Sequence, residues 1–416
     1  MPSAIHSIKG AVQHYAWGKD GRSRPLVRQV WEVQNGEEDA NGDEEKYAEI
    51  WLGTHPNGPS KTNSSTTLLE LIESDPVFFL GSQHSAKNLP YLLKLLSIQK
   101  VLSIQSHPDL ELAAKLHEQN PAVYKDACHK PEMAIALTPF VAMCGFRPLG
   151  IIVENLSLYP EIARIVSAES VDGIKAAYGK TMGLVDFDTT TQLALKALFS
   201  SFMANFDTSG TKPLSDCIER LKAKNKDDMT ELDVLILDFS RQFPGDCGVF
   251  SPLFLAVHKL SPGSSLFVPA NTPHAYITGE IIECMARSDN VIRCGLTPKF
   301  KDVGVLCDSL SYDTTPQSPC DGEDIGGNTK LYRPPVNDFE VRVITGGGTY
   351  NVDAGLDSGS LLLALGGACT LVINDGAENL HLKRGEAAFL AANHKLTVEN
   401  ATEDLKIVRS TRNLRK

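Results

Sequence analysis

The chain has 416 residues, which at roughly 150 residues per domain suggests two or three domains. It carries 40 Lys and Arg against 51 Asp and Glu, a formal net charge of −11, whereas a dedicated nucleic-acid binder carries a basic domain or stripe. Apolar residues make up 42% of the chain, enough for ordinary globular cores, and this excludes disorder over most of its length.

No apolar stretch reaches the roughly 20 residues that a membrane helix needs, and the N-terminus lacks the apolar core of a signal peptide. The nine cysteines form no CxxC pair, which argues against a disulfide scaffold and for a reducing compartment. We therefore expect a cytoplasmic protein that binds neither nucleic acid nor a membrane. We also expect it to be a monomer.

Short apolar runs alternate with turn-rich segments from Ala11 to Ile104, and helices interrupt them. Thr67 and Glu70 have the spacing of a capping box at the start of TLLELIES, which predicts a short helix ending before Pro76. Asp109 is the expected N-cap of a second helix, LELAAKLHEQ.

The pattern becomes helical between residues 151 and 246. Large apolar residues recur there at the three- and four-residue spacing of an amphipathic helix. They are Leu195, Leu198, Phe199, Phe202 and Phe206. We therefore predict a helical domain over 151–246.

After Gly248, short runs rich in β-branched residues return, separated by Pro and Gly. The stretch 313–328 is rich in Pro, Gly, Ser and Asp and is typical of a linker. The sequence therefore predicts a mainly β protein with an α insertion. One β domain is expected from 1–150 and 247–313, and a second from 314–416.

The segment KVLSIQSHPD offers the first residues suited to a metal ion. Val101–Ile104 is predicted to be a strand, so alternation places Ser103, Gln105 and His107 on one face. A Gln and a His two residues apart can approach one ion from such a face. The alternative is a polar strand end beside a loop.

Two further segments contribute one residue each. In HKPEMAIAL, Glu132 begins a buried strand, where a carboxylate must be paired, coordinated or hydrated; a salt bridge with Lys130 is the alternative. The spacing G-x5-P-x-N-x2-H, from Gly263 to His274, resembles the second motif of the cupin fold, whose His points into a barrel and binds metal. A surface His in an ordinary strand–turn–strand is the alternative there.

Two imidazoles, one carboxylate and one amide oxygen suit zinc and leave room for water or substrate. Because thiolates are missing, an open, catalytic site is a better interpretation than a closed structural one. The predicted ligands are Gln105, His107, Glu132 and His274.

The segment 280–303 gathers cations within an acidic chain, which favours an anionic substrate group such as phosphate. A surface strand pair of mixed charge is the alternative. The cations are Arg287, Arg293, Lys299 and Lys301, with Glu283 and Asp289 between them.

These segments, in this order, resemble the type I phosphomannose isomerases. The resemblance also covers QHYAWGK, YAEIWLGTHPNGPS, LPYLLKLLSIQKVLSIQSHPD, PHAYITG, IIECMARSDNVIR and GLTPKFKDV, and it is weak over the last hundred residues. It implies a jelly-roll cupin domain, an inserted helical domain and a second cupin-like domain without metal.

The resemblance also implies an activity. Mannose 6-phosphate and fructose 6-phosphate would be interconverted through an enediol, with one zinc ion on Gln105, His107, Glu132 and His274, and the product would feed GDP-mannose and glycan synthesis. It places the family's essential arginine at Arg293.

Further residues are implied to line or support the pocket. They are Trp17, Lys94, Lys130, Tyr276, Glu283, Asp289 and Lys299. Ser103 joins Trp17, Lys94 and Lys299 as expected substrate-binding residues, although packing or surface charge remains an alternative for Trp17 and Lys94.

The proton-transfer group stays open at this point. Glu283 and Asp289 are candidate bases, Lys130 and Tyr276 are candidate proton carriers, and a zinc-bound hydroxide is a further alternative. Two other functions compete: a cupin iron dioxygenase and a non-catalytic sugar-phosphate binding protein.

Overall fold

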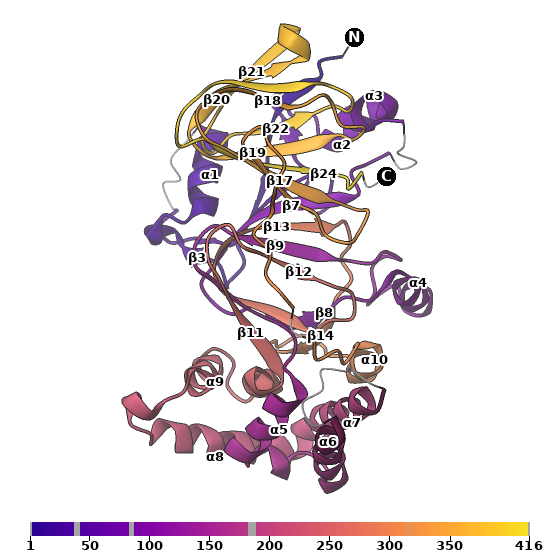
Figure 1. Ribbon diagram of the computed structural model, residues 1–416, viewed down its shortest axis with the longest axis vertical. Helices are drawn as coiled ribbons and strands as arrows, with labels where there is room; N and C mark the ends of the chain where they lie inside the picture. The colour runs from indigo at the N-terminus through magenta and orange to yellow at the C-terminus, as the bar shows by residue number, and fades with distance from the viewer. Residues whose placement is uncertain (1, 37–41, 83–86, 182–188, 316, 415–416) are drawn as a thin grey trace.

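The computed structural model describes residues 2–36, 42–82, 87–181, 189–315 and 317–414. A central sheet lies between a group of helices at one end of the molecule and the C-terminal strands at the other (Figure 1). All nine cysteines are free thiols. Within the described residues, no helix is long and apolar enough to cross a membrane.

The central sheet has ten strands, and its main path runs β11-β10-β13-β7-β5-β2. Its longest strand, β13, also pairs with the short strands β8 and β9. All eight residues of β7 are buried, as expected for a near-continuous apolar run inside a covered sheet. The strands are β2 (Ala11–Gln13), β5 (Glu49–Leu52), β7 (Tyr91–Ile98), β8 (Ile104–Ser106), β9 (Glu132–Ala136), β10 (Phe140–Phe146), β11 (Leu255–Leu260), β12 (Ser265–Val268), β13 (His274–Ala286) and β14 (Ile292–Gly295).

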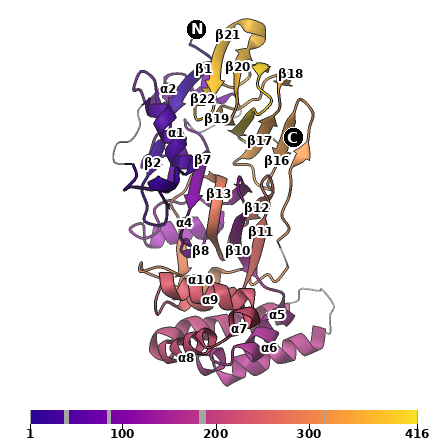
Figure 2. The same cartoon turned by 90° about the vertical axis from the view of Figure 1, so that its left-hand side faces the viewer.

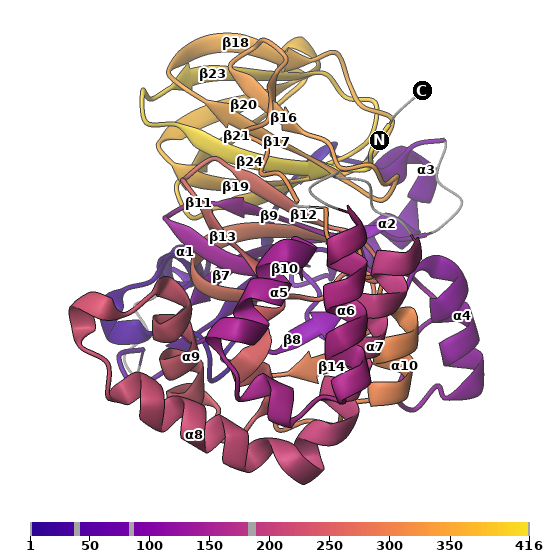
Figure 3. The ribbon, with the colours of Figure 1, turned by 60° about the horizontal axis from the view of Figure 1, so that its bottom comes forward.

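The helical segment is inserted between two neighbouring strands of this sheet. The chain leaves β10 at Phe146 and returns in β11 at Leu255, and these two residues are antiparallel partners. The segment forms the layer that comes forward in Figure 3, with Phe199 and Phe202 buried as the apolar spacing predicts. It contains α5 (Leu149–Leu158), α6 (Ala168–Thr181), α7 (Thr189–Asn205), α8 (Thr211–Lys222), α9 (Glu231–Gln242), and the shorter turns η2 (Ile162–Arg164), η3 (Phe206–Gly210), η4 (Lys226–Asp228) and η5 (Cys247–Leu253).

The C-terminal part consists of an eight-stranded and a four-stranded antiparallel sheet that share one apolar core. Figure 2 shows both at the end opposite the helices. The first sheet contains β15 (Glu323–Asp324), β16 (Thr329–Tyr332), β17 (Glu340–Thr345), β24 (Lys406–Thr411), β19 (Ser360–Gly366), β22 (Ala387–Leu390), β1 (Ile5–Lys9) and β6 (Lys61–Thr62). The second contains β18 (Gly348–Asp353), β23 (Leu396–Ala401), β20 (Ala368–Ile373) and β21 (Glu378–Lys383), and η6 (Asn374–Gly376) joins the last two. The architecture is therefore mainly β with a helical insertion, as predicted.

Two strands from the start of the chain belong to the C-terminal sheet. Ile5 in β1 pairs with Leu390 in β22, and Lys9 pairs with Lys61 in β6. Sheet hydrogen bonding therefore continues across the predicted boundary between the first and last β domains. The domain limits themselves remain a prediction.

The stretch predicted as a linker is held against the central sheet. The backbones of Ser265 and Cys320 exchange hydrogen bonds of 2.7 and 3.0 Å, and Ser264 Oγ donates to Asp321. Glu323 continues this contact by pairing with Leu331 in β16. Pro316 lies outside the described residues. The rest of the stretch is thus a bonded connection rather than a free linker.

The shorter elements lie around the N-terminal half. Thr67 and Glu70 form the predicted capping box of α2, and the Asp109 carboxylate accepts from Leu112 N at 2.9 Å at the start of α4, so both helix starts are confirmed. These elements are β3 (Lys19–Asp20), β4 (Lys46–Tyr47), η1 (Gly21–Ser23), α1 (Leu26–Asn35), α2 (Leu68–Ser74), α3 (Pro76–Leu80), α4 (Leu110–Gln119) and α10 (Val303–Ser309).

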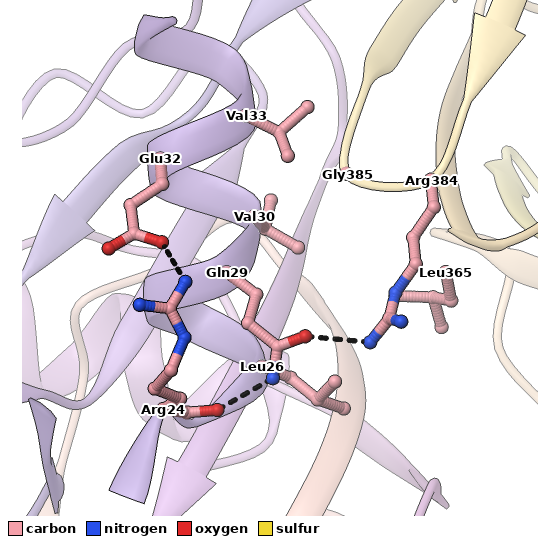
Figure 4. A pocket seen from close by; sticks show the side chains of 9 residues that line it. All are labelled: Arg24, Leu26, Gln29, Val30, Glu32, Val33, Leu365, Arg384 and Gly385. Carbon is pink, nitrogen blue, oxygen red and sulfur yellow. Dashed lines mark hydrogen bonds and ion pairs between the residues drawn. The ribbon is translucent and has the colours of Figure 1, made fainter. Parts of the chain in front are cut away.

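Helix α1 lies between the central sheet and the C-terminal strands. A cavity of about 240 Å³ separates it from the turn at Arg384 and Gly385 (Figure 4). Arg384 spans this gap and donates to Gln29 Oε1 at 2.7 Å. Gln34 donates to Gly385 O at 3.1 Å, so hydrogen bonds join the two parts on either side of the cavity.

Candidate metal centre and active site

A cavity of about 720 Å³ opens beside β13, and the end of the helical segment forms part of its wall. Eleven of the thirteen residues predicted for the site line it. They are Trp17, Lys94, Ser103, Gln105, Lys130, Glu132, Tyr276, Glu283, Asp289, Arg293 and Lys299. The other two, His107 and His274, are buried and contact Glu132. The structure therefore brings the whole predicted set together.

Glu132 lies between the two imidazoles. Its Oε1 is 3.2 Å from His107 Nε2, and its Oε2 is 3.2 Å from His274 Nε2. All three side chains are about 1% exposed, and their ligand atoms lie within 4.8 Å of one another. Among the described residues, this is the one group of three His, Cys, Asp or Glu side chains with metal-binding spacing.

The hydrogen bonds that the two imidazole rings make through Nδ1 determine whether the Nε2 atoms facing Glu132 carry a proton. His107 Nδ1 donates to Asn290 O at 2.7 Å, and His274 Nδ1 donates to Thr272 O at 3.0 Å. Burial lowers the pKa of His107 to about 4, so this ring is neutral near pH 7. In this tautomer Nε2 has no proton to donate, and both Nε2 atoms and Glu132 Oε2 lack hydrogen-bond partners among the residues that the structure describes. Three buried acceptors facing one another fit a cation.

The pairing register of the sheet places Gln105 next to this group. It is the antiparallel partner of His274 on one side and of Arg293 on the other. Directly opposed residues project to the same face of a sheet, so all three side chains lie on one face, and Gln105 and Arg293 line the cavity there. Gln105 is thus placed to add an amide oxygen to the three buried ligands.

The strand predicted at Val101–Ile104 begins later along the chain in the structure. Strand β8 begins at Ile104 and ends at Ser106, and Ser103 precedes it. Val101 N and Leu102 N bond outside the β8 ladder, to Gln242 Oε1 at 3.0 Å and to Tyr276 O at 2.9 Å. Those contacts hold the preceding residues as a loop, although Ser103 still lines the cavity.

A buried charge network lies along β7 and β13. Lys94 Nζ is 3.0 Å from Glu283 and 3.6 Å from Glu49, and it sits 5.1 Å from the centre of the Trp51 ring. Burial alone would lower the pKa of Lys94, but the two carboxylates outweigh burial and raise it. Lys94 is therefore a fixed cation.

The acidic groups of the site differ in their ionisation. Burial raises the pKa of Glu283 although Lys94 opposes the shift. Burial would also raise the pKa of Glu132, but Lys130, with its Nζ 3.1 Å from Oε1, lowers it well below its usual value. Burial and nearby Glu283 raise the pKa of Tyr276, whose hydroxyl finds no hydrogen-bond partner in the described part of the chain. Of Glu132, Glu283 and Asp289, Glu283 is thus the one whose pKa is moved upward, toward that of a working base.

Asp289 and Arg293 also line the cavity. His55 Nε2 is 3.2 Å from Asp289 Oδ1, and this contact lowers the pKa of the carboxyl. Arg293 is half-buried, and among the described residues no carboxylate forms an ion pair with it. Burial lowers its pKa, yet a guanidinium stays charged at any working pH. An unpaired guanidinium in a cavity suits an anion.

Trp17 and Lys299 are more exposed than the buried ligands. Trp17 is half-buried against the apolar cluster around Tyr276, and Lys299 is exposed without an ion pair within the described chain. Lys100 is a further exposed cation that lines the cavity.

Comparisons with known proteins identify the family of the chain. Residues 5–149 match the family model "Phosphomannose isomerase type I, catalytic domain", and residues 166–255 match its "helical insertion domain". The chain is 38% identical to the mannose-6-phosphate isomerase of Mus musculus, with 98% of each chain covered. It is 37% identical to that of Cryptococcus neoformans, with 96% of this chain and 97% of the relative covered.

The chain belongs to the type I phosphomannose isomerase family.

Solved structures of phosphomannose isomerases share the fold over nearly the whole length. The Salmonella typhimurium mannose 6-phosphate isomerase bound to fructose 6-phosphate and zinc has a TM-score of 0.81 at 28% identity, covering 99% of this chain and all of that chain. A zinc-bound holo structure of a mannose 6-phosphate isomerase has a TM-score of 0.80 at the same identity and coverage.

Several cavity residues of this phosphomannose isomerase family member were missed by the sequence analysis. Glu49, Trp51 and His55 lie within the quoted signature YAEIWLGTHPNGPS, but nothing in their spacing indicates contact with Lys94 or Asp289. Cross-strand pairing brings Trp51 opposite Lys94, a long-range fact that local pattern does not contain. The other missed residues include Tyr15, Lys100, Gln242 and Phe243.

Proposed function

We propose that the protein is a zinc-dependent aldose–ketose isomerase that interconverts mannose 6-phosphate and fructose 6-phosphate through an enediol. The buried His107–Glu132–His274 group beside an unpaired Arg293 is the observation that carries the proposal. Family membership supports it, since relatives covering almost the whole chain are named mannose-6-phosphate isomerase.

The donor set fits zinc. Two imidazoles and a carboxylate are common zinc ligands, and Gln105 would be the fourth. With no thiolate in the group, a position remains for water or substrate. Bound there, zinc would supply Lewis-acid polarisation of the sugar oxygens.

We assign proton transfer to Glu283. A general base works best when its pKa approaches the operating pH, and burial moves the pKa of Glu283 upward whereas His55 moves that of Asp289 downward. Lys94, at 3.0 Å, orients the Glu283 carboxylate. Tyr276 and Lys130 are proposed to pass protons between the sugar oxygens.

Arg293 is proposed to stabilise the negative charge that develops on oxygen as the proton leaves carbon. The exposed cations Lys299 and Lys100, with the Ser103 hydroxyl, form a second polar group at the cavity, which suits a phosphate dianion. Trp17 is proposed to pack against the sugar. These roles separate the reacting carbons from the charged end of the substrate.

A cupin iron dioxygenase is the competing chemical class, because two His and one carboxylate also bind ferrous iron. The cations around the cavity and the family membership favour the isomerase. A non-catalytic sugar-phosphate binder would not need three buried ligands.

One coupled assay distinguishes these functions. Fructose 6-phosphate is incubated with the purified protein, and mannose 6-phosphate formation is followed before chelation, after chelation and after addition of zinc or ferrous iron. Isomerisation that disappears with chelator and returns with zinc supports the proposal. Dioxygen uptake with iron would instead indicate the dioxygenase, and sugar-phosphate binding without turnover would indicate the non-catalytic binding protein.

The remaining assignments are proposals of the same kind. We propose that the β parts are cupin-like jelly rolls comprising 1–150 with 247–313 and 314–416, with a helical domain over 151–246. We further propose a cytoplasmic monomer whose product supplies GDP-mannose and glycan synthesis.

The pH dependence of the reaction should report Glu283. A base must be ionised, so kcat/KM is retained above its pKa and lost as the pH falls through it. Because burial raises this pKa above 4.5, the acid limb should lie above pH 4.5. Lys94 lowers the same pKa, so Lys94→Met should move the limb to higher pH.

Profiles of kcat/KM against pH for the wild type, Lys94→Met and the exposed control Lys115→Met test this assignment. An acid limb that stays in place in Lys94→Met, with turnover still measurable, would assign the base to another group.

The C-terminal sheets are predicted to hold no zinc. His381 is exposed on β21, and the His394 ring packs against Phe78 with its Nδ1 2.6 Å from Ala392 O. We expect His381→Ala and His394→Ala to keep wild-type zinc content and turnover. Metal analysis by mass spectrometry and the coupled assay check this, and loss of zinc in either variant would contradict it.

A further inference from the structure

The end of the helical segment touches both loops that carry the proposed phosphate ligands. Gln242, the last residue of α9, and Phe243 line the cavity. The two loops are 100–103, which ends at Ser103, and 296–299, which ends at Lys299. Four residues after Gln242, Asp246 precedes η5.

Asp246 is bonded to the second loop through its carboxylate. Its Oδ1 accepts from Leu296 N at 2.6 Å, and its Oδ2 accepts from Thr297 N at 3.3 Å. Thr297 Oγ1 in turn accepts from Lys299 N at 3.1 Å. A continuous series of hydrogen bonds therefore runs from the helical segment to the backbone of Lys299.

Close backbone contact reinforces this connection. A Cβ on Gly295 would lie 2.7 Å from Gly248 Cα, so only a residue without a side chain fits there. The next residue, Leu296, has φ +51°, a conformation that non-glycine residues rarely adopt. The Asp246 oxygen on its amide holds it there. The conformation of this loop is thus set by its contacts with Asp246 and Gly248 rather than by the intrinsic backbone preference of its residues.

Gln242 holds the first loop in a similar way. Its Oε1 accepts from Val101 N at 3.0 Å, and its Nε2 donates to Asp238 Oδ2 at 2.8 Å. The second bond fixes the orientation of the amide. Residues 100–103, which leave the strand ladder, are therefore held by the helical segment together with Tyr276 O.

We propose that Asp246 and Gln242 are positioning residues that set the phosphate-binding loops, so that the inserted helical segment takes part in substrate recognition. This inference rests on the proposed function, because it names the part of that site which recognises the phosphate group. Neither residue is assigned a role in proton transfer or in zinc binding.

Steady-state kinetics on the zinc-loaded, full-length protein test the proposal. Loss of one or two hydrogen bonds at a positioned loop is expected to raise KM for mannose 6-phosphate on the order of 10-fold in Asp246→Ala and in Gln242→Ala. The inhibition constant of inorganic phosphate should rise by the same factor, while kcat and zinc content change little. Asp246→Asn keeps one acceptor oxygen and should give an intermediate KM.

The control is Asp227→Ala, which removes an exposed carboxylate from η4 in the same helical segment. It should leave both constants at wild-type values. Unchanged KM and phosphate inhibition in a folded Asp246→Ala would overturn the proposal. So would a fall in kcat or zinc content at constant KM, because the contacts would then serve only the fold. If Asp246→Ala does not fold, the KM and the phosphate inhibition constant of Gln242→Ala and Asp246→Asn test the proposal instead.

Calorimetry with inorganic phosphate separates this inference from the proposed function. A wild type that does not isomerise mannose 6-phosphate would refute the function. Phosphate affinity that is equal in the wild type and Asp246→Ala would refute the positioning role alone.

Discussion

Glu132→Gln is expected to lower zinc content and turnover together. The substitution keeps the shape of the side chain but removes the negative charge that faces His107 Nε2 and His274 Nε2. Loss of a residue that only supports a ligand typically costs about 10- to 100-fold in metal affinity, so loss of the ligand's charge should cost more than about 100-fold. Mass spectrometry of the purified variant gives zinc per chain, and the coupled assay gives turnover.

Glu118→Gln is the matched control, because it makes the same change on the exposed face of α4. His274→Ala should behave like Glu132→Gln, since it removes a second buried ligand. A full complement of zinc in both site variants would place the metal elsewhere.

Arg293→Ala should reduce turnover by about 100- to 1,000-fold, the usual result of losing a preorganised donor to a developing oxyanion. The guanidinium has no ion-pair partner within the described residues, so its charge is available to the substrate. Zinc content should stay intact, because Arg293 is not among the buried ligands. KM should change less than kcat, since the interaction is made in the transition state.

Lys299→Ala provides the comparison. If Lys299 binds phosphate, its loss should raise KM with a smaller effect on kcat. The same kinetic pattern in Arg293→Ala would reassign Arg293 to phosphate binding, and a wild-type turnover number would refute its catalytic role.

Local signals in the sequence predicted the features that are determined locally. The capping box of Thr67 and Glu70 and the Asp109 cap depend on residues three apart, and both are present. Three of the four residues predicted to bind metal lie together with metal-binding spacing, because Pro and Gly punctuation marks the ends of short strands where polar side chains meet a cavity. Resemblance to a family then joined these separate segments into one site.

The features that were missed depend on contacts between distant parts of the chain. Strand β8 starts later than predicted because Gln242, far along the sequence, binds Val101 N. The ionisation of Asp289 follows from His55, which another part of the central region supplies. Alternation and spacing describe one segment at a time, so neither interaction could be read from them.

The pairing of β1 with β22 has a consequence for biosynthesis. Ile5 emerges from the ribosome long before its partner Leu390, and at about 5 to 20 residues per second the interval is roughly 20 to 80 seconds. During that time β1 has no partner in β22, and an unpaired strand edge is a template for wrong association. The nascent chain must therefore keep its first strand out of aggregates until almost the last strand has been translated, which makes chaperone capture of this segment a natural step in its maturation.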